Sequence, residues 1–144
     1  MIEGIALQAE IRTSPPSEKR LADDRSRVNA FSVDVEDYFQ VLAFDSVIRR
    51  ADWDRYPIRA IDQVYRLLDL MDEFGVTGTF FVLAWIAERA PAMVPRIAAA
   101  GHEIASHGWD HQLVTRMTPE QFAADVTRSR QLLEDQSGKP ILGY

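Results

Sequence analysis

The sequence contains no cysteine, which excludes disulfide bonds and thiolate metal ligands. Basic residues are few as well: 16 Lys and Arg stand against 22 Asp and Glu, so the formal net charge is −6 at pH 7. No run of Lys or Arg is longer than two residues. This composition argues against nucleic acid or an anionic membrane surface as the main partner.

Long apolar runs are also missing. We find neither a secretory signal nor a transmembrane segment, so the cytoplasm is the default location. Residues 1–27 are polar and contain Pro15 and Pro16, which predicts a poorly ordered leader. We expect one domain over residues 28–144.

The sequence does contain enough apolar material for a packed core, because 47% of its residues are hydrophobic and 10% are aromatic. Short apolar runs alternate with stretches of helical periodicity, most of which end at a glycine. This pattern predicts strands over 28–35, 77–83 and 102–107, a fourth strand beginning at 139–144, and helices over 58–75, 84–90, 91–101 and 118–138. The alternation indicates an α/β fold with a parallel sheet, truncated at the start of its fourth strand.

Two histidines, His107 and His111, stand four residues apart just after the third predicted strand. Neutral imidazoles are common ligands for zinc and similar metals, and a pair at this spacing can converge on one ion. Parallel α/β folds place their sites after strands, which favours a metal site over two surface histidines. The third histidine, His102, begins the same strand and is expected at the opposite end of the sheet, in a structural or exposed role.

Three acidic residues, Asp34, Glu36 and Asp37, end the first predicted strand. The two-residue period of a strand directs Asp34 and Glu36 to one side and Asp37 to the other, unless the chain has already turned. Together with the histidine pair they predict a site of two histidines and one carboxylate that leaves a position open to water. A second carboxylate would then be free to take a proton. The other interpretation is a polar loop whose acids cap a helix.

Four segments carry a resemblance to a known family: "FSVDVEDYF", "GTFFVLAWIAE", "GHEIASHGWDH" and "SGKPILGY". They resemble the NodB-homology polysaccharide deacetylases, the carbohydrate esterases of family four, and look closest to the subgroup that accompanies exosortase and exopolysaccharide gene clusters. The resemblance runs from about residue 28 to the C-terminus. It implies the N-terminal portion of a deformed (β/α) barrel and a hydrolase that removes N-acetyl groups from a polysaccharide with a metal-activated water.

The resemblance also implies roles for single residues. His107 and His111 match the metal-binding histidines of the family, and Asp34 best matches its general base. Most members carry two adjacent aspartates here, of which the second binds the metal. In this chain another residue follows Asp34, so either Glu36 or Asp37 is the metal carboxylate. Zinc is the expected metal, and cobalt or nickel would also suit two histidines and a carboxylate.

Other parts of the family's site are expected beyond this sequence. The third motif of the family begins with an arginine directly after a Gly-Tyr pair such as the one at 143–144, and later strands supply an acetyl pocket and a general acid. We therefore expect an incomplete fragment whose own activity is doubtful. Two alternatives stay open: a non-catalytic metal- or sugar-binding remnant, and an interaction module that self-associates through an exposed sheet edge.

Residues 38–57 have weak periodicity and predict a long loop with one helical turn at most. Loops of this length are usually functional, and we expect this one to form a lip over the substrate groove. Aromatic faces offer apolar area to the C–H side of a sugar ring, so the aromatic residues here are candidates for stacking: Tyr38, Phe39, Trp53 and Tyr56. The alternative is that they only cover the mouth of the barrel.

Overall fold

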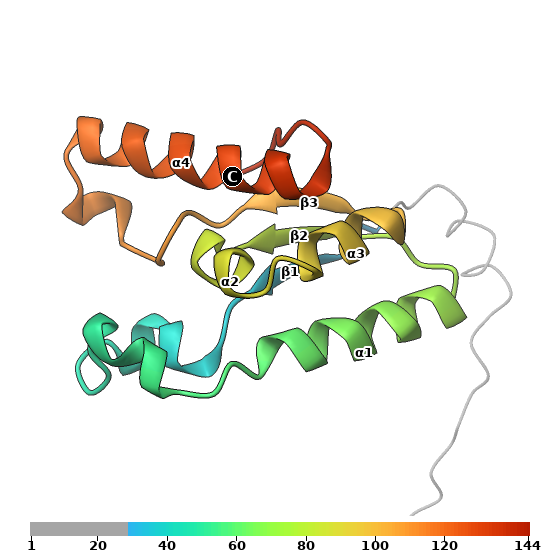
Figure 1. Cartoon of the computed structure of the whole chain (residues 1–144), viewed down its shortest axis with the longest axis horizontal. Coiled ribbons are helices and arrows are strands. Elements are labelled where there is room, and N and C mark those ends of the chain that lie inside the picture. The colour runs from blue at the N-terminus through green and yellow to red at the C-terminus, as the bar shows by residue number, and fades with distance from the viewer. Residues whose placement is uncertain (1–28) are drawn as a thin grey trace, which may run out of the picture.

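Three short parallel strands form a sheet in the order β1-β2-β3 in the computed structural model, which describes residues 29–144 (Figure 1). The strands are β1 (Ser32–Val35), β2 (Thr79–Val82) and β3 (Glu103–Ser106). The predicted leader over residues 1–27 lies outside the described part of the chain. The α/β class and the parallel sheet that the sequence predicts are confirmed.

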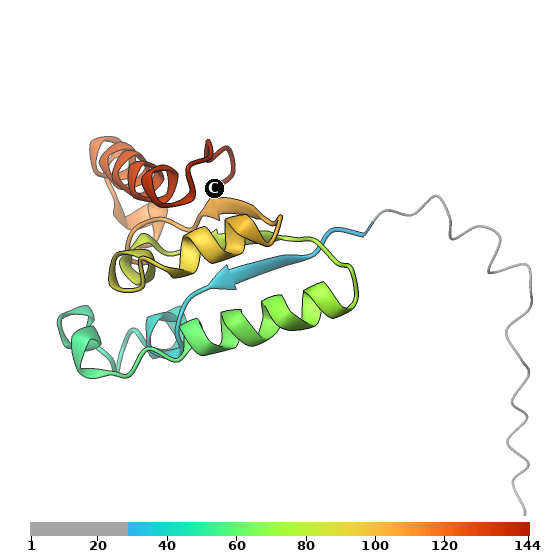
Figure 2. The same ribbon diagram turned by 45° about the vertical axis from the view of Figure 1, so that its right-hand side comes forward.

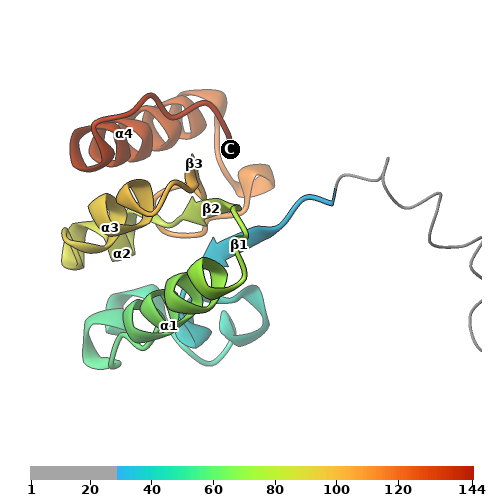
Figure 3. The same cartoon turned by 90° about the vertical axis from the view of Figure 1, so that its right-hand side faces the viewer.

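The four α-helices gather on one side of this sheet (Figure 3). They are α1 (Ala60–Glu73) before β2, α2 (Ala84–Arg89) and α3 (Met93–Ala99) between β2 and β3, and α4 (Pro119–Ser137) after β3. Phe80 and Val82 of β2 are fully buried, whereas Phe81 between them is only partly buried. Helices that cover one face of a parallel sheet are the arrangement of a partial (β/α) barrel.

The strand register places the ends of the three strands next to one another. Val35 pairs with Val82, and Val82 pairs with Ser106, so the three strands end side by side. The next residues along β1 and β3 are Glu36 and His107, which flank the end of β2. The backbone alone therefore delivers an acid and a histidine to the same edge of the sheet.

Helix α4 begins and ends where its sequence signals predict. The Thr118 hydroxyl accepts a hydrogen bond from the Gln121 amide at 3.2 Å, and the Gln121 side chain accepts one from the Thr118 amide at 2.8 Å. This reciprocal capping box is followed by Pro119 at the first helical position. Gly138 ends the helix with φ 66°, a left-handed conformation that glycine adopts at no steric cost.

Two details of the sequence prediction were wrong. Residues 38–57 form three short 3-10 helices in place of a loop with one turn: η3 (Tyr38–Gln40), η4 (Leu42–Phe44) and η5 (Arg50–Arg55). These helices lie beyond the carboxyl end of β1 (Figure 2). Residues 139–144 do not form a strand, although the Ser106 amide donates a hydrogen bond to the Gly143 carbonyl at 2.9 Å and holds this segment beside β3.

A further 3-10 helix, η6 (Val114–Arg116), lies between β3 and α4. Within residues 29–144, no helix combines the length and the apolar character that crossing a membrane requires.

Candidate metal centre

Glu36, His107 and His111 converge at the carboxyl end of the sheet. The Nε2 atom of His111 lies 3.2 Å from Glu36 Oε2, and the Nε2 atom of His107 lies 3.9 Å from the same oxygen. One ligand atom from each residue lies within 4.8 Å of the other two. Two imidazoles and one carboxylate are the ligand set of catalytic zinc sites, which keep a further position open.

Two of these ligand atoms lack a partner. Glu36 Oε2 and His107 Nε2 are both buried, and neither makes a hydrogen bond. Leaving a buried polar atom unsatisfied costs about 1–3 kcal/mol, so a fold that keeps two of them facing each other needs a reason. A divalent cation would satisfy both atoms at once, and the residues present therefore fit a metal.

The electrostatics of His107 also suit a ligand. Burial is the main effect, and it lowers the pKa of this imidazole below its usual value. The charge of Asp34 raises this pKa, His111 lowers it and Glu36 raises it, in decreasing order of importance. The net effect favours the neutral imidazole, which is the form that binds a metal.

The backbone holds the two histidines differently. The His107 amide donates to the Val82 carbonyl at 3.0 Å and so continues the pairing of β3 with β2. His111 has φ 57°, and it is the one residue other than glycine with positive φ in the described range. For an L-residue this left-handed conformation costs roughly 1–2 kcal/mol, so other contacts must stabilise it.

Asp37 does not join the metal-binding group. Its carboxylate accepts hydrogen bonds from the amides of Tyr38 at 2.9 Å, Arg59 at 2.5 Å and Ala60 at 2.9 Å. In return, the Asp37 amide donates to the side chain of Gln40 at 2.8 Å, which completes a capping box on η3. Of the two candidate metal carboxylates, the structure brings Glu36 to the histidines and gives Asp37 the helix-capping role.

Asp34 is exposed on β1 and lies outside the group of three ligands. Its negative charge raises the pKa of His107, against the larger lowering by burial.

The aromatic candidates divide into exposed and buried residues. Tyr38 is 37% exposed and Tyr56 is partly buried, so both reach the surface. Trp53 is only 3% exposed, and its ring packs edge-on against Phe39 and Trp85 at centroid distances of 6.0 and 5.5 Å. The expectation that Trp53 and Phe39 stack on a sugar does not fit this burial, because neither offers a free ring face.

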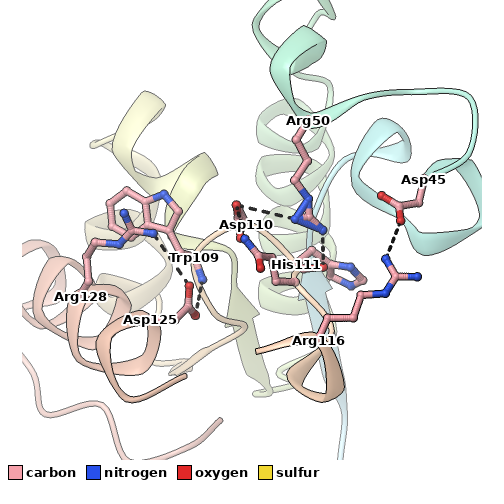
Figure 4. Close-up of polar contacts among 9 residues, drawn as sticks. Asp45, Arg50, Trp109, Asp110, His111, Arg116, Asp125 and Arg128 are labelled. Atoms are coloured by element: carbon pink, nitrogen blue, oxygen red, sulfur yellow. Dashed lines mark hydrogen bonds and ion pairs between the residues drawn. The ribbon is translucent and has the colours of Figure 1, made fainter. Parts of the chain in front are cut away.

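Two residues that the sequence did not single out contact the loop over 107–111 (Figure 4). The Arg50 guanidinium donates to the His111 carbonyl at 2.9 Å, and the Asp125 carboxylate accepts from the Trp109 amide at 3.0 Å. Asp125 could have been found from the sequence, because its four-residue spacing from Ser129 and then Leu133 places it on the buried face of α4. Arg50 could not, because 61 residues separate it from His111.

His102 is buried, and its Nδ1 accepts a hydrogen bond from the Gly78 amide at 3.3 Å. It directly precedes β3, at the end of the strand opposite the candidate ligands, so it contributes to the fold and lies away from the candidate site.

The chain is similar in sequence to proteins of a known family. The family model for polysaccharide deacetylase matches residues 42–144. The peptidoglycan-N-acetylglucosamine deacetylase PgdA of Listeria monocytogenes is 31% identical over 72 residues, which cover 50% of this chain and 16% of that protein. A peptidoglycan-N-acetylglucosamine deacetylase of Bacillus cereus is 29% identical over 121 residues, which cover 81% of this chain and 42% of the relative.

The fold agrees with solved structures as well. A protein from Mycobacterium smegmatis that is assigned to the polysaccharide deacetylases superimposes with a TM-score of 0.64 and 33% identity, over 78% of this chain and 40% of that one. The chain thus spans less than half the length of each of these relatives. Because the family model matches well over half of its 144 residues, the chain belongs to the polysaccharide deacetylase family.

Proposed function

We propose that this chain carries the metal-binding and proton-accepting part of a deacetylase that hydrolyses N-acetyl groups on a polysaccharide. The observation that carries the proposal is the convergence of Glu36, His107 and His111, with two buried ligand atoms that have no hydrogen-bond partner. Family membership supplies the reaction class, and the relatives from Listeria and Bacillus act on peptidoglycan N-acetylglucosamine.

In this proposal Glu36, His107 and His111 hold a divalent cation. Zinc is our first choice, and cobalt or nickel would suit the same ligands. When bound, the cation would lower the pKa of a water molecule and polarise the acetyl carbonyl. Asp34 takes the proton of the attacking water, because it is the carboxylate two residues before Glu36 on β1, its charge acts on His107, and it lies outside the group of three candidate ligands.

Tyr38 and Tyr56 are the proposed sugar-contacting residues. Both lie in the segment 38–57 and reach the surface, and their rings meet edge-on at a centroid distance of 6.3 Å. The Arg59 guanidinium lies 5.0 Å from the centre of the Tyr38 ring, so it braces one face of that ring. The edge and opposite face of Tyr38 are then the parts that would contact a pyranose.

Four finer expectations stay predictions: membership of the exosortase-associated subgroup, zinc as the native metal, self-association through a sheet edge, and a cytoplasmic location. Among the strands of residues 29–144, none pairs with the outer edge of β1, and this edge is where a second copy would pair.

The test combines metal binding with turnover. The purified chain is titrated with Zn²⁺ or Co²⁺, and acetate release from an N-acetylated chito-oligosaccharide is followed before and after a chelator is added. We expect one cation per chain in the wild type and none in His107→Ala. Equal binding by the two proteins would overturn the proposal. Release that depends on the cation would establish the reaction. Because the chain spans less than half the length of these relatives, acetate release is also measured in a longer deacetylase that carries this segment, where cation binding without release would favour the non-catalytic metal-binding alternative.

A further inference from the structure

The loop over residues 107–111, here called the histidine loop, is fastened by backbone hydrogen bonds over its first three residues. The Gly108 carbonyl accepts from the Ala84 amide at 3.0 Å, and the Trp109 carbonyl accepts from the Trp85 amide at 2.9 Å. Both donors belong to the first turn of α2. His107 is held in turn by Val82.

His111 lies beyond these anchors. Within residues 29–144 it makes no hydrogen bond to another backbone group. Its left-handed conformation, with φ 57°, is one that an L-residue adopts only under external constraint. Even so, its Nε2 atom points at Glu36 Oε2 from 3.2 Å, so something fixes this residue in place.

The side chain of Arg50 supplies the missing constraint. One guanidinium nitrogen donates to the His111 carbonyl at 2.9 Å, and another lies 3.7 Å from the Asp110 carboxylate. Figure 4 shows Arg50 reaching from η5 to these two neighbouring residues of the loop. The guanidinium also lies 5.5 Å from the centre of the Trp53 ring, and Trp53 is buried in the core. Arg50 is therefore itself braced against a rigid part of the fold.

We propose that Arg50 is a positioning residue for the metal ligand His111. Arg50 does not contact the Nε2 atom of His111 or the Oε2 atom of Glu36. It holds the backbone of His111 and thereby determines how the His111 imidazole is oriented toward Glu36. This inference rests on the proposed metal site. It also gives the segment 38–57 a task besides covering the barrel mouth, because η5 becomes the support of the distal ligand.

The contact needs an arginine and not only a positive charge. A guanidinium presents several N–H donors in a rigid fork and can hold the carbonyl and the carboxylate at once, whereas a lysine is a flexible point charge. Arg50→Lys keeps the charge and loses the fork, and Arg50→Ala removes both. If charge alone mattered, the lysine variant would behave as the wild type.

Arg116 offers a matched control. Its guanidinium pairs with Asp45 at 3.0 Å and so connects the same two parts of the chain, the segment 38–57 and the residues after β3. Figure 4 shows this pair beside the histidine loop, with no interaction drawn to His111. Arg116→Ala therefore removes an inter-segment ion pair and leaves the support of His111 intact.

The experiment measures Co²⁺ affinity and the visible spectrum of bound Co²⁺ in the wild type, in Arg50→Ala, in Arg50→Lys and in Arg116→Ala. Removing a residue that orients a metal ligand typically weakens binding about 10- to 100-fold, and we expect this loss in both Arg50 variants with an altered Co²⁺ spectrum. The Arg116→Ala variant is expected to match the wild type. Wild-type affinity and spectrum in both Arg50 variants would overturn the inference. The lysine variant keeps this test available if the alanine variant does not fold.

A second readout needs no metal. The ¹³Cα chemical shift of His111 reports its backbone conformation, and we expect it to leave the left-handed range in Arg50→Ala but not in Arg116→Ala. An unchanged shift in Arg50→Ala would contradict the inference while leaving the metal site in place. Conversely, equal Co²⁺ binding by the wild type and His107→Ala would remove the proposed metal function, and the chemical shift would still decide whether Arg50 holds His111.

Discussion

His107 and His111 aim at the same point but are held by different kinds of structure. His107 directly follows β3, and its amide continues the sheet pairing to Val82. His111 lies four residues further on, in a left-handed conformation, and its carbonyl is held by the side chain of Arg50. Side chains on strands are placed more accurately than those on loops, so the distal histidine needs a dedicated support.

The two neighbouring acids at the end of β1, Glu36 and Asp37, differ in the same way. Glu36 follows the strand directly and meets the histidines, whereas Asp37 turns away to cap η3 and to accept the amides of Arg59 and Ala60. One carboxylate belongs to the site, and its neighbour holds the segments around the site. We call Glu36, Asp34 and His107 the sheet side of the site, and His111 its loop side.

The largest effect is expected on the sheet side, at Asp34. In a whole deacetylase that carries this segment, Asp34→Asn is expected to lower the rate of acetate release by about 10²- to 10⁴-fold, because a positioned proton acceptor contributes this much. Zn²⁺ binding should remain, since Asp34 lies outside the group of three candidate ligands. Loss of the metal from Asp34→Asn, to the same extent as from His107→Ala, would show that Asp34 is a ligand.

The next effect separates the two neighbouring acids. Glu36→Ala is expected to abolish high-affinity Zn²⁺ binding without lowering the free energy of unfolding of the metal-free protein, because the buried Glu36 Oε2 atom makes no hydrogen bond. Asp37→Ala should do the reverse: it keeps the metal and lowers the free energy of unfolding by about 1–3 kcal/mol, because it removes a cap and leaves buried amides unpaired. Calorimetric metal titration and chemical denaturation measure the two quantities. The opposite pattern would make Asp37 the ligand.

A smaller effect tests the strain on the loop side. Since His111 has φ 57°, His111→Gly is expected to be more stable than His111→Ala by up to about 1 kcal/mol in chemical denaturation, because glycine adopts the left-handed conformation without steric cost. At position 107 the order should be the opposite, with alanine more stable than glycine. If alanine is favoured at both positions, His111 is not held in the left-handed conformation.

The smallest effect is a shift of the His107 pKa. In the metal-free protein burial holds this pKa below its usual value, and the charge of Asp34 raises it. NMR titration should therefore give a still lower pKa for His107 in Asp34→Asn, with no change in the control Asp72→Asn, an exposed residue in the last turn of α1. A raised or unchanged His107 pKa in Asp34→Asn would show that the charge of Asp34 does not act on His107.

This pKa also makes stability depend on pH. A histidine whose pKa is lower in the folded than in the unfolded chain stabilises the fold fully above the unfolded value of about 6.5. The contribution is lost as the pH falls from there through the folded pKa. Denaturation of the metal-free protein at several pH values should show this loss, and it should be smaller in His107→Ala.

The sequence predicted those parts of the molecule that depend on local signals. The parallel sheet follows from the alternation of apolar runs and helical periods, and the ends of α4 follow from Thr118, Gln121 and Gly138. Strand ends lie together in a parallel sheet, so the sequence also predicted that His107 and an acid from the end of β1 would meet, but it left Glu36 and Asp37 as alternatives for that acid. His107 and Glu36 needed only the strand order and the register to meet.

The remaining features depend on contacts between residues far apart in the chain. Nothing local indicates that Asp37 turns to the amides of Arg59 and Ala60, 22 and 23 residues away. The burial of Trp53 depends likewise on Trp85 in α2. Arg50 is one of several arginines in its segment, and only the folded chain shows that it is the one that reaches His111.

The most direct test of the account is to locate the metal. Crystals grown with Zn²⁺ and measured on both sides of the zinc absorption edge should show one anomalous peak per chain between Glu36, His107 and His111. The ligand distances should be about 2.0–2.2 Å, and the Asp37 carboxylate should still lie on the amides of Arg59 and Ala60. A peak bound by Asp37, or no peak at the two histidines under saturating Zn²⁺, would contradict the account.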